Sequence, residues 1–231
     1  LHVSGNRLVG PDGKEVWLQG VAIPGLEIRP EGHGAVRSTI EAVKNWHANV
    51  VRLAVSDTYW FGRGKPGKET AGQTDGGAAY RAVIDAAVNA AANRGAYIVI
   101  DLHVYRAISN EHLAFWTEAA AKYANHPAVL FDIINEPHGI SWQVWRDGGF
   151  VPTKSKKVID ESAFLSEAEK KKNEGFESPG MQKTVDHIRA LGARNIIIAG
   201  GLDWAYDLSG IVEGYALKDT PQGNGIMYSA H

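Results

Sequence analysis

The residues of this sequence that could do chemistry follow directly after short apolar runs. They are an arginine, three histidines, an asparagine, three acidic residues and a tryptophan: Arg52, Asp101, His103, Asn135, Glu136, His138, Asp203, Trp204 and His231. Carboxyl, imidazole and amide groups together suit proton transfer to or from a polar substrate. Each residue alone could have a structural role, as a member of an ion pair or as a helix cap. Because such residues follow several successive apolar runs, one shared site is the favoured interpretation.

The tripeptide Asn135-Glu136-Pro137 is the strongest candidate among these positions. Pro137 cannot continue a hydrogen-bonded strand, so we expect the strand before it to end here. Glu136 would then lie at the mouth of the sheet, partly desolvated by neighbouring strands. Burial favours the protonated form of a carboxyl group, which suits a general acid near neutral pH. The tripeptide alone is a weak signal, but the apolar run before it, 130–134, strengthens it.

Six apolar runs rich in β-branched residues must position these side chains. Their apolar character is almost continuous, which is typical of strands buried on both faces of a parallel sheet. The predicted strands are Val16–Val21, Val50–Val55, Tyr97–Leu102, Val129–Ile134, Asn195–Ala199 and Ile226–Tyr228.

Helical patterns separate the predicted strands. Ser38-Thr39-Ile40-Glu41 has the spacing of a capping box, which predicts a helix start there. An alanine-rich helix is predicted over Gly77–Asn93, and another over Asn110–Asn125 that opens on its asparagine. Ser178-Pro179 predicts a cap followed by proline at the first helical position, with the helix ending at Gly192.

Alternating strands and helices fit either a doubly wound sheet or a (β/α)₈ TIM barrel. The segment after the first predicted strand, Gly20–Gly25, lacks the glycine spacing of nucleotide-binding loops, which favours the barrel. No linker divides residues 1–231, so we expect a single barrel domain. Only about six of the eight strands are present, so we expect a chain truncated at its C-terminus. Alternatively, the remaining strands come from another polypeptide.

The segment Asp147–Ser178 is rich in glycine and lysine and interrupts the alternation. The simpler interpretation is a solvated surface excursion with a short helix near Glu161–Lys172. The alternative is a wall of the substrate cleft, since the segment leaves from the end of a strand where barrel sites are built.

Composition excludes several classes of function. A formal net charge of −2 gives no reason to expect nucleic acid or an anionic membrane as a partner, and no apolar run is long enough to span a bilayer. The absence of cysteine excludes disulfides, thiol nucleophiles and cysteine-based metal sites. Histidines at metal-binding spacing are also missing, so we expect neither a metal nor another cofactor.

Several motifs, taken in order, resemble those of glycoside hydrolase family 5, retaining glycosidases with a (β/α)₈ barrel. The matching segments are Trp17-Leu18-Gln19-Gly20-Val21, Asn49-Val50-Val51-Arg52-Leu53, Ile100-Asp101-Leu102-His103, Phe131-Asp132-Ile133-Ile134-Asn135-Glu136-Pro137 and Tyr228-Ser229-Ala230-His231. Their order and spacing match the family over nearly the whole chain.

The resemblance implies a role for each matched residue. Glu136 would be the general acid/base, and Asn135 would hydrogen-bond the sugar 2-hydroxyl in the −1 subsite. Arg52 would lie beneath the catalytic carboxylates, and His103 and His231 would line the −1 subsite. Three aromatic residues near the same rim are candidate substrate-binding residues, the two tryptophans as stacking platforms: Trp204, Trp142 and Tyr105.

A retaining glycosidase also needs a carboxylate nucleophile, which this family carries at the end of the seventh strand. No residue here matches it, so we expect the nucleophile beyond residue 231. The resemblance implies a secreted, extracellular hydrolase of β-linked polysaccharide or oligosaccharide, monomeric when the barrel is complete. An endo-β-1,4-glucanase is the first expectation, ahead of enzymes for mannan, xyloglucan or β-1,3-glucan. The alternative is a carbohydrate-binding barrel without turnover.

Overall fold

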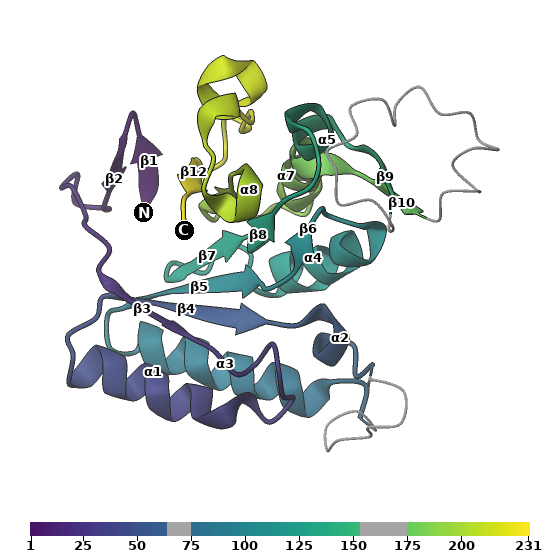
Figure 1. The fold of residues 1–231 in the computed structure, drawn as a ribbon. Coiled ribbons are helices and arrows are strands. Elements are labelled where there is room, and N and C mark those ends of the chain that lie inside the picture. The colour runs from purple at the N-terminus through teal and green to yellow at the C-terminus, as the bar shows by residue number, and fades with distance from the viewer. Residues whose placement is uncertain (64–74, 153–174) are drawn as a thin grey trace. The chain divides into compact units, whose positions relative to one another are not determined.

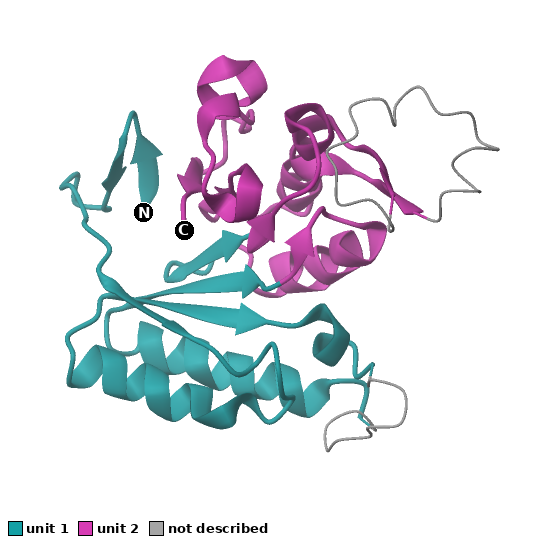
Figure 2. Cartoon of the chain, viewed as in Figure 1, with its two compact units in different colours: residues 1–103, 125–132 teal, residues 104–124, 133–231 magenta. Residues whose placement is uncertain are grey.

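The structure of the protein is a computed structural model that describes residues 1–63, 75–152 and 175–231. The described residues form two units, drawn in different colours in Figure 2: residues 1–103 with 125–132, and residues 104–124 with 133–231. We call them unit 1 and unit 2. The predicted short helix near Glu161–Lys172 lies outside the described residues.

Unit 1 is built on parallel strands in the order β3-β4-β5-β7, preceded by a small antiparallel hairpin of β1 and β2. The register places Leu53 opposite Ile100 and Ile100 opposite Phe131, three side chains that are fully buried. The strands are β1 (His2–Ser4), β2 (Arg7–Val9), β3 (Gly20–Ile23), β4 (Val50–Val55), β5 (Tyr97–Leu102) and β7 (Val129–Asp132).

Four helical segments complete unit 1: η1 (Gly32–Gly34), α1 (Ala35–Lys44), α2 (Asp57–Trp60) and α3 (Ala78–Ala92). Helices α1 and α3 run side by side along the strands of unit 1 (Figure 1). The capping box predicted at Ser38 is wrong, because α1 already begins at Ala35. Its N-cap is Gly34, whose φ of 78° is left-handed and which starts the helix one turn early.

The strands of unit 2 are paired with one another in three places. β6 (Tyr105–Arg106) pairs in parallel with β8 (Glu136–Pro137), and β11 (Ile197–Gly200) pairs in parallel with β12 (Ile226–Ser229). β9 and β10 form an antiparallel pair. The other elements of unit 2 are β9 (Gly149–Pro152), β10 (Gly175–Ser178), α4 (Asn110–Lys122), α5 (Trp142–Asp147), α7 (Gly180–Ala190), α8 (Leu202–Ala205) and the π-helix η3 (Ile211–Tyr215).

The predicted strands are all present, and two of them, Val50–Val55 and Tyr97–Leu102, have the predicted bounds. The first strand is wrong in position, since it begins at Gly20 rather than at Val16. The side chain of Asn49 explains the shift. It accepts a hydrogen bond from the Gln19 amide at 2.7 Å and donates one to the Trp17 carbonyl at 2.6 Å. The side chain thus pairs backbone groups that a neighbouring strand would otherwise pair.

Helix α4 begins at Asn110, as predicted, and its cap is Ser109, whose hydroxyl accepts from the His112 amide while His112 Nδ1 accepts from the Ser109 amide. Histidine thus completes a capping box that normally uses glutamate. Pro179 is the N-cap of α7 rather than its first residue. No helix within the described ranges is both long enough and apolar enough to cross a bilayer.

Two buried tryptophans anchor the backbone of unit 2. The indole N–H of Trp116 on α4 donates to the Ile133 carbonyl at 3.2 Å, and that of Trp145 on α5 donates to the Gly200 carbonyl at 2.9 Å. Both indole rings are almost fully buried. Ile133 precedes Asn135 by two residues and Gly200 ends β11, so each tryptophan fixes a segment that leads into the polar residues singled out above.

Replacing Trp116 by Phe should lower the free energy of unfolding by roughly 1–3 kcal/mol, because the substitution keeps most of the packing but leaves a buried carbonyl without its donor. Trp46, whose side chain is 67% exposed, provides the matched control. Trp46→Phe should change the free energy of unfolding by less than about 0.5 kcal/mol. Urea unfolding curves measure both, and equal effects of the two substitutions would contradict the anchoring role.

Candidate active site

Unit 1 carries a buried cluster of charged side chains at the carboxyl ends of three adjacent strands. Asp101 on β5 lies opposite Asp132 on β7 in the strand register. Arg52 on β4 bridges them: Nη1 is 3.1 Å from Asp101 Oδ2, and Nε and Nη2 are 3.0 and 2.9 Å from Asp132 Oδ2. His103 completes the cluster, with Nδ1 2.6 Å from Asp101 Oδ2. We call these four residues the arginine cluster.

The arginine cluster is strongly shielded from water, which determines its electrostatics. The side chains of Asp101 and Asp132 are 0% and 2% exposed, and that of Arg52 is 22% exposed. Burial and the neighbouring charge of Asp101 raise the pKa of Asp132 well above its ordinary value, although Arg52 opposes the shift. A single cation thus faces two carboxyl groups, of which Asp132 favours its protonated form.

The cluster fixes the imidazole of His103. Because Oδ2 of Asp101 is acceptor-only when ionised, the short contact with Nδ1 favours the tautomer whose proton lies on Nδ1. The side chain of His103 is 18% exposed, so its ring is held at the edge of the buried cluster. In this arrangement Asp101 acts as a hydrogen-bond acceptor for His103.

Glu136 belongs to unit 2 and is placed by a very short parallel ladder. β8 lies against β6 so that Glu136 is opposite Tyr105, and the Glu136 amide donates to the Val104 carbonyl at 3.4 Å. Its side chain is 27% exposed, and Oε1 lies 3.1 Å from Nδ1 of His231. Asn135, the residue before it, is only 2% exposed. The structure therefore brings Glu136 and His231 into contact, with the carboxylate still reachable from solvent.

Three aromatic side chains of the same unit lie next to one another. The imidazole of His138 and the indole of Trp204 are stacked, with centroids 3.4 Å apart and planes 12° apart. The ring of Tyr105 lies 6.1 Å from that of Trp204. Trp204 and Tyr105 are 45% and 46% exposed, so both present ring surface to solvent. We call His138, Trp204 and Tyr105 the aromatic platform.

The backbone that carries Trp204 is unusual. Asp203, Trp204 and Ala205 all have positive φ, at 52°, 61° and 65°, a conformation that costs energy for residues other than glycine. Two reciprocal backbone hydrogen bonds of 2.9 Å between Leu202 and Asp207 close the turn. The turn holds the indole against His138.

Trp142 contacts a different set of residues from the other two predicted aromatic side chains. It packs edge-on against Trp145 at 5.0 Å and nearly parallel to Tyr215 at 6.3 Å. It lines a cavity of about 470 Å³ together with Tyr215 and Asp207. The sequence analysis grouped Trp142 with Trp204 and Tyr105. In the structure the ring of Trp142 instead contacts Trp145 and Tyr215 and lines this cavity.

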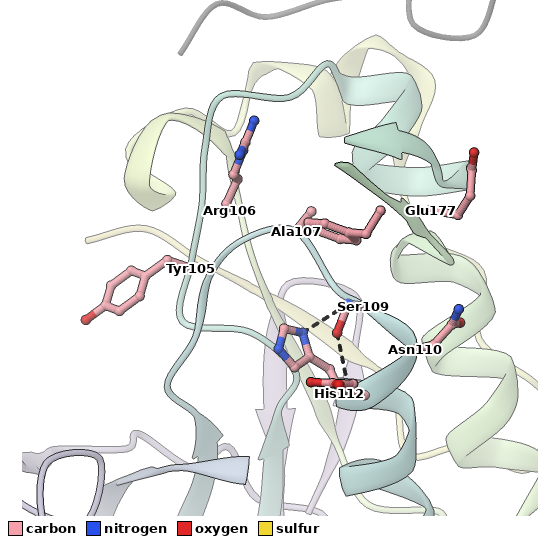
Figure 3. A pocket seen from close by; sticks show the side chains of 9 residues that line it. Tyr105, Arg106, Ala107, Ser109, Asn110, His112 and Glu177 are labelled. Atoms are coloured by element: carbon pink, nitrogen blue, oxygen red, sulfur yellow. Dashed lines mark hydrogen bonds between the residues drawn. The ribbon is translucent and has the colours of Figure 1, made fainter. Parts of the chain in front are cut away.

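A second cavity, also of about 470 Å³, borders Tyr105 on the side of α4. Figure 3 shows it, with the two hydrogen bonds between Ser109 and His112 on its wall. The ring of Tyr105 points away from both residues. Tyr105 thus contributes its ring to the aromatic platform rather than to the interior of this cavity.

Sequence reasoning assigned no role to Asp132, although a signal was available. The residue is a carboxylate within an otherwise apolar run, where an acidic side chain needs a buried partner. His138 was singled out, but its stacking on Trp204 was not foreseen. In the part of the chain that the structure describes, no group of three or more potential ligands is arranged to hold a metal ion.

Comparison with known proteins gives a consistent family. The sequence profile described as "Cellulase (glycosyl hydrolase family 5)" matches residues 9–231. Endoglucanase A of Butyrivibrio fibrisolvens is 35% identical over 153 residues, 64% of this chain and 33% of the relative. Cellulase CelDZ1 of Thermoanaerobacterium sp. is 26% identical over 242 residues, 100% of this chain and 51% of the relative. The chain thus spans about a third to a half of these curated relatives.

Solved structures agree on the fold. β-Glucanase SdGluc5_26A of Saccharophagus degradans, crystallised with cellotetraose, superposes with a TM-score of 0.66 at 24% identity, covering 100% of this chain and 60% of that one. The catalytic domain of Thermobifida fusca endoglucanase Cel5A (E5) gives 0.64 at 19% identity, with 100% and 63% covered. The predicted (β/α)₈-barrel fold, present in part, is confirmed.

The raised pKa of Asp132 predicts a pH-dependent effect of Asp132→Asn. The buried carboxyl stabilises the fold in its protonated form, and that contribution is lost as pH rises through its raised pKa. An asparagine never ionises, and its oxygen can still accept from Arg52. The difference in free energy of unfolding, variant minus wild type, should therefore become more favourable to the variant as the pH rises above the ordinary pKa range of an aspartate. Denaturant titrations at several pH values measure it, and a difference that moves the opposite way would refute the assignment.

Proposed function

Since the chain belongs to the cellulase family, glycosyl hydrolase family 5, we propose that the protein hydrolyses β-1,4-linked glucan by a retaining mechanism. The observation that carries the proposal is the setting of Glu136. The carboxylate of Glu136 is partly exposed, and its Oε1 lies 3.1 Å from Nδ1 of His231. The backbone of Glu136 pairs with that of Tyr105, whose ring belongs to the aromatic platform. The curated relatives are an endoglucanase and a cellulase, which supports the substrate class.

Glu136 is the general acid/base of the proposal. In the first step it donates its proton to the glycosidic oxygen as that bond breaks, and a carboxylate nucleophile attacks the anomeric carbon. In the second step Glu136 takes a proton from water, which displaces the nucleophile from the sugar. His231 holds one carboxylate oxygen of Glu136 through Nδ1, so the side chain keeps one orientation through both steps.

The nucleophile is a glutamate supplied by chain outside residues 1–231. No carboxylate of this sequence occupies the corresponding position of the family, and retention requires two carboxyl groups about 5–5.5 Å apart. The chain covers 60% of the matched Saccharophagus β-glucanase, which supports a contribution from additional sequence.

The other residues bind and orient the sugar. His103 and His231 line the −1 subsite, and Asn135 donates its amide to the 2-hydroxyl. Arg52 acts through the arginine cluster, because its guanidinium holds Asp101 and Asp101 holds His103. Trp204 and Tyr105 offer exposed ring faces on which the apolar face of a pyranose stacks.

A polymeric substrate is too large to enter a cell, so we place the protein outside the cell. Cellulose-type glucan is the first substrate, since the matched Saccharophagus β-glucanase was crystallised with cellotetraose. Mannan, xyloglucan and β-1,3-glucan are the competitors in a substrate panel. The protein acts without a cofactor in this proposal.

Glu136→Gln tests the proposal, made in the protein encoded by the complete gene. Glutamine keeps the shape but cannot transfer a proton, so kcat on cello-oligosaccharides should fall by about 10³-fold or more while sugar binding persists. Reducing-sugar release measures kcat, and calorimetric titration of cellotetraose measures binding. Tyr206→Ala, which removes a ring that is 73% exposed, is the control and should keep full activity.

Two outcomes would overturn parts of the proposal. Unchanged turnover in Glu136→Gln would remove Glu136 from the acid/base role. A wild-type protein that binds cello-oligosaccharides but hydrolyses no member of the panel would instead be a carbohydrate-binding barrel without turnover.

A further inference from the structure

The segment that carries Glu136 is held by a short ladder with long hydrogen bonds. β8 contains two residues, and the second, Pro137, has no backbone N–H to donate. The Glu136 amide donates to the Val104 carbonyl at 3.4 Å, and the His138 amide donates to the Arg106 carbonyl at 3.3 Å. A reacting group displaced by about 1 Å can lose about 10²-fold in rate. Contacts from outside this ladder are therefore needed to fix a general acid at this place.

The side chain of His138 supplies one such contact. Its Nδ1 lies 3.0 Å from the carbonyl oxygen of Glu136, two residues earlier in the chain. Because a carbonyl oxygen only accepts hydrogen bonds, Nδ1 carries the proton and donates it. The hydrogen bond closes a turn around Pro137. The orientation of the Glu136 backbone, and with it the direction of the carboxyl side chain, thus depends on the position of the imidazole ring.

The imidazole ring is itself fixed by the indole of Trp204. The two rings are stacked, with centroids 3.4 Å apart, so His138 cannot rotate without losing the stack. Trp204 lies on α8, which packs against β8 within unit 2 (Figure 1). At Gly200, the last residue of β11, a Cβ would lie 3.1 Å from both the Asn135 carbonyl oxygen and the ring of Pro137. The backbone before the turn therefore packs directly on the same segment.

A second route connects the turn at Asp203, Trp204 and Ala205 to the carboxylate of Glu136. The Ala205 carbonyl accepts from the His231 amide at 3.1 Å, and Nδ1 of His231 lies 3.1 Å from Oε1 of Glu136. The turn thus reaches Glu136 through its backbone by one residue and through its side chain by another. All of these residues belong to unit 2.

The backbone conformation of the turn agrees with a role in positioning. Asp203, Trp204 and Ala205 have positive φ, and such strain persists where the surrounding structure over-determines it, often at functional sites. A relaxed backbone would move both the indole that holds His138 and the carbonyl that holds His231. The strained conformation therefore maintains both contacts to the general acid of the proposal.

We propose that His138 is a positioning residue for Glu136: it is held against Trp204 by the strained turn, and its hydrogen bond to the Glu136 carbonyl directs the carboxyl group toward the glycosidic oxygen. The inference rests on the proposed acid/base role of Glu136, and it requires no contact between His138 and the sugar. Its consequence is a dependence on the leaving group. A misdirected acid slows cleavage when the leaving oxygen needs a proton and hardly affects a leaving group that departs as a stable anion.

Two substitutions in the protein encoded by the complete gene separate the hydrogen bond from the ring stack. His138→Phe keeps a flat ring beside Trp204 but has no donor, whereas His138→Asn loses the ring and keeps an N–H at the place of Nδ1. The measured quantity is kcat/KM for two substrates, cellotetraose and 2,4-dinitrophenyl β-cellobioside, whose phenolate leaves without a proton.

The two substrates should respond differently. In His138→Phe, kcat/KM should fall about 10²-fold for cellotetraose and less than about threefold for the aryl glycoside. In His138→Asn, the ratio of the two kcat/KM values should return to within about fivefold of the wild-type ratio, because the donor is restored.

His187→Phe is the matched control. His187 lies on α7 of the same unit, and its Nε2 is 2.8 Å from the hydroxyl oxygen of Thr117. The control should leave the ratio within about twofold of wild type, because His187 does not contact the segment of Glu136. Both substrates are assayed on one sample, so the ratio is independent of the fraction of folded protein. A merely structural role of His138 would lower both values equally.

An equal loss for both substrates in His138→Phe would overturn the positioning role, as would a wild-type ratio in that variant or a ratio in His138→Asn as low as in His138→Phe. If His138→Phe does not fold, His138→Ala, which also lacks the donor, takes its place. Failure of the catalytic proposal is distinguishable, because Glu136→Gln then hydrolyses cellotetraose like the wild type. Failure of this inference alone leaves Glu136→Gln inactive and the ratio in His138→Phe unchanged.

Discussion

One arginine compensates two buried carboxyl groups, and the polar architecture of unit 1 depends on that pairing. Asp101 and Asp132 lie opposite each other on neighbouring strands, an arrangement that repels when both are ionised. Arg52 contacts both, and the raised pKa of Asp132 lowers the remaining charge. Such a cluster adds little net stability compared with an apolar replacement, but removing one member costs about 3–5 kcal/mol. The cluster therefore fixes the relative positions of β4, β5 and β7 where His103 leaves the sheet.

Unit 2, by contrast, carries a carboxylate and aromatic rings that stay partly exposed. Glu136 lies on a ladder of two residues per strand, too short to be stable alone. The buried indoles of Trp116 and Trp145 hold the backbone on either side through single hydrogen bonds. Unit 2 thus combines buried tryptophan anchors with the exposed rings of Trp204 and Tyr105.

The sequence predicted the positions of the buried strands better than the local geometry. Continuous apolar runs locate buried strands well, so β4 and β5 have their predicted bounds. The first strand failed because Asn49 satisfies the backbone of residues 17–19 with its side chain, an interaction between distant residues that periodicity cannot reveal. The start of α1 failed because a left-handed Gly34 preceded a plausible capping box. The role of Asp132 and the stack of His138 on Trp204 depend on tertiary contacts in the same way.

The left-handed turn at Asp203, Trp204 and Ala205 has a consequence for engineering. Each non-glycine residue in this conformation costs of order 1–3 kcal/mol, and the turn contains three in a row. Glycine substitutions there would relieve the strain, so an automated search for thermostability should select them. At Trp204 the same substitution deletes the indole that stacks on His138. This turn is accordingly a place where backbone strain and the stacked pair of His138 and Trp204 are set against each other within a single residue, and directed evolution for heat tolerance should be screened for loss of that pair.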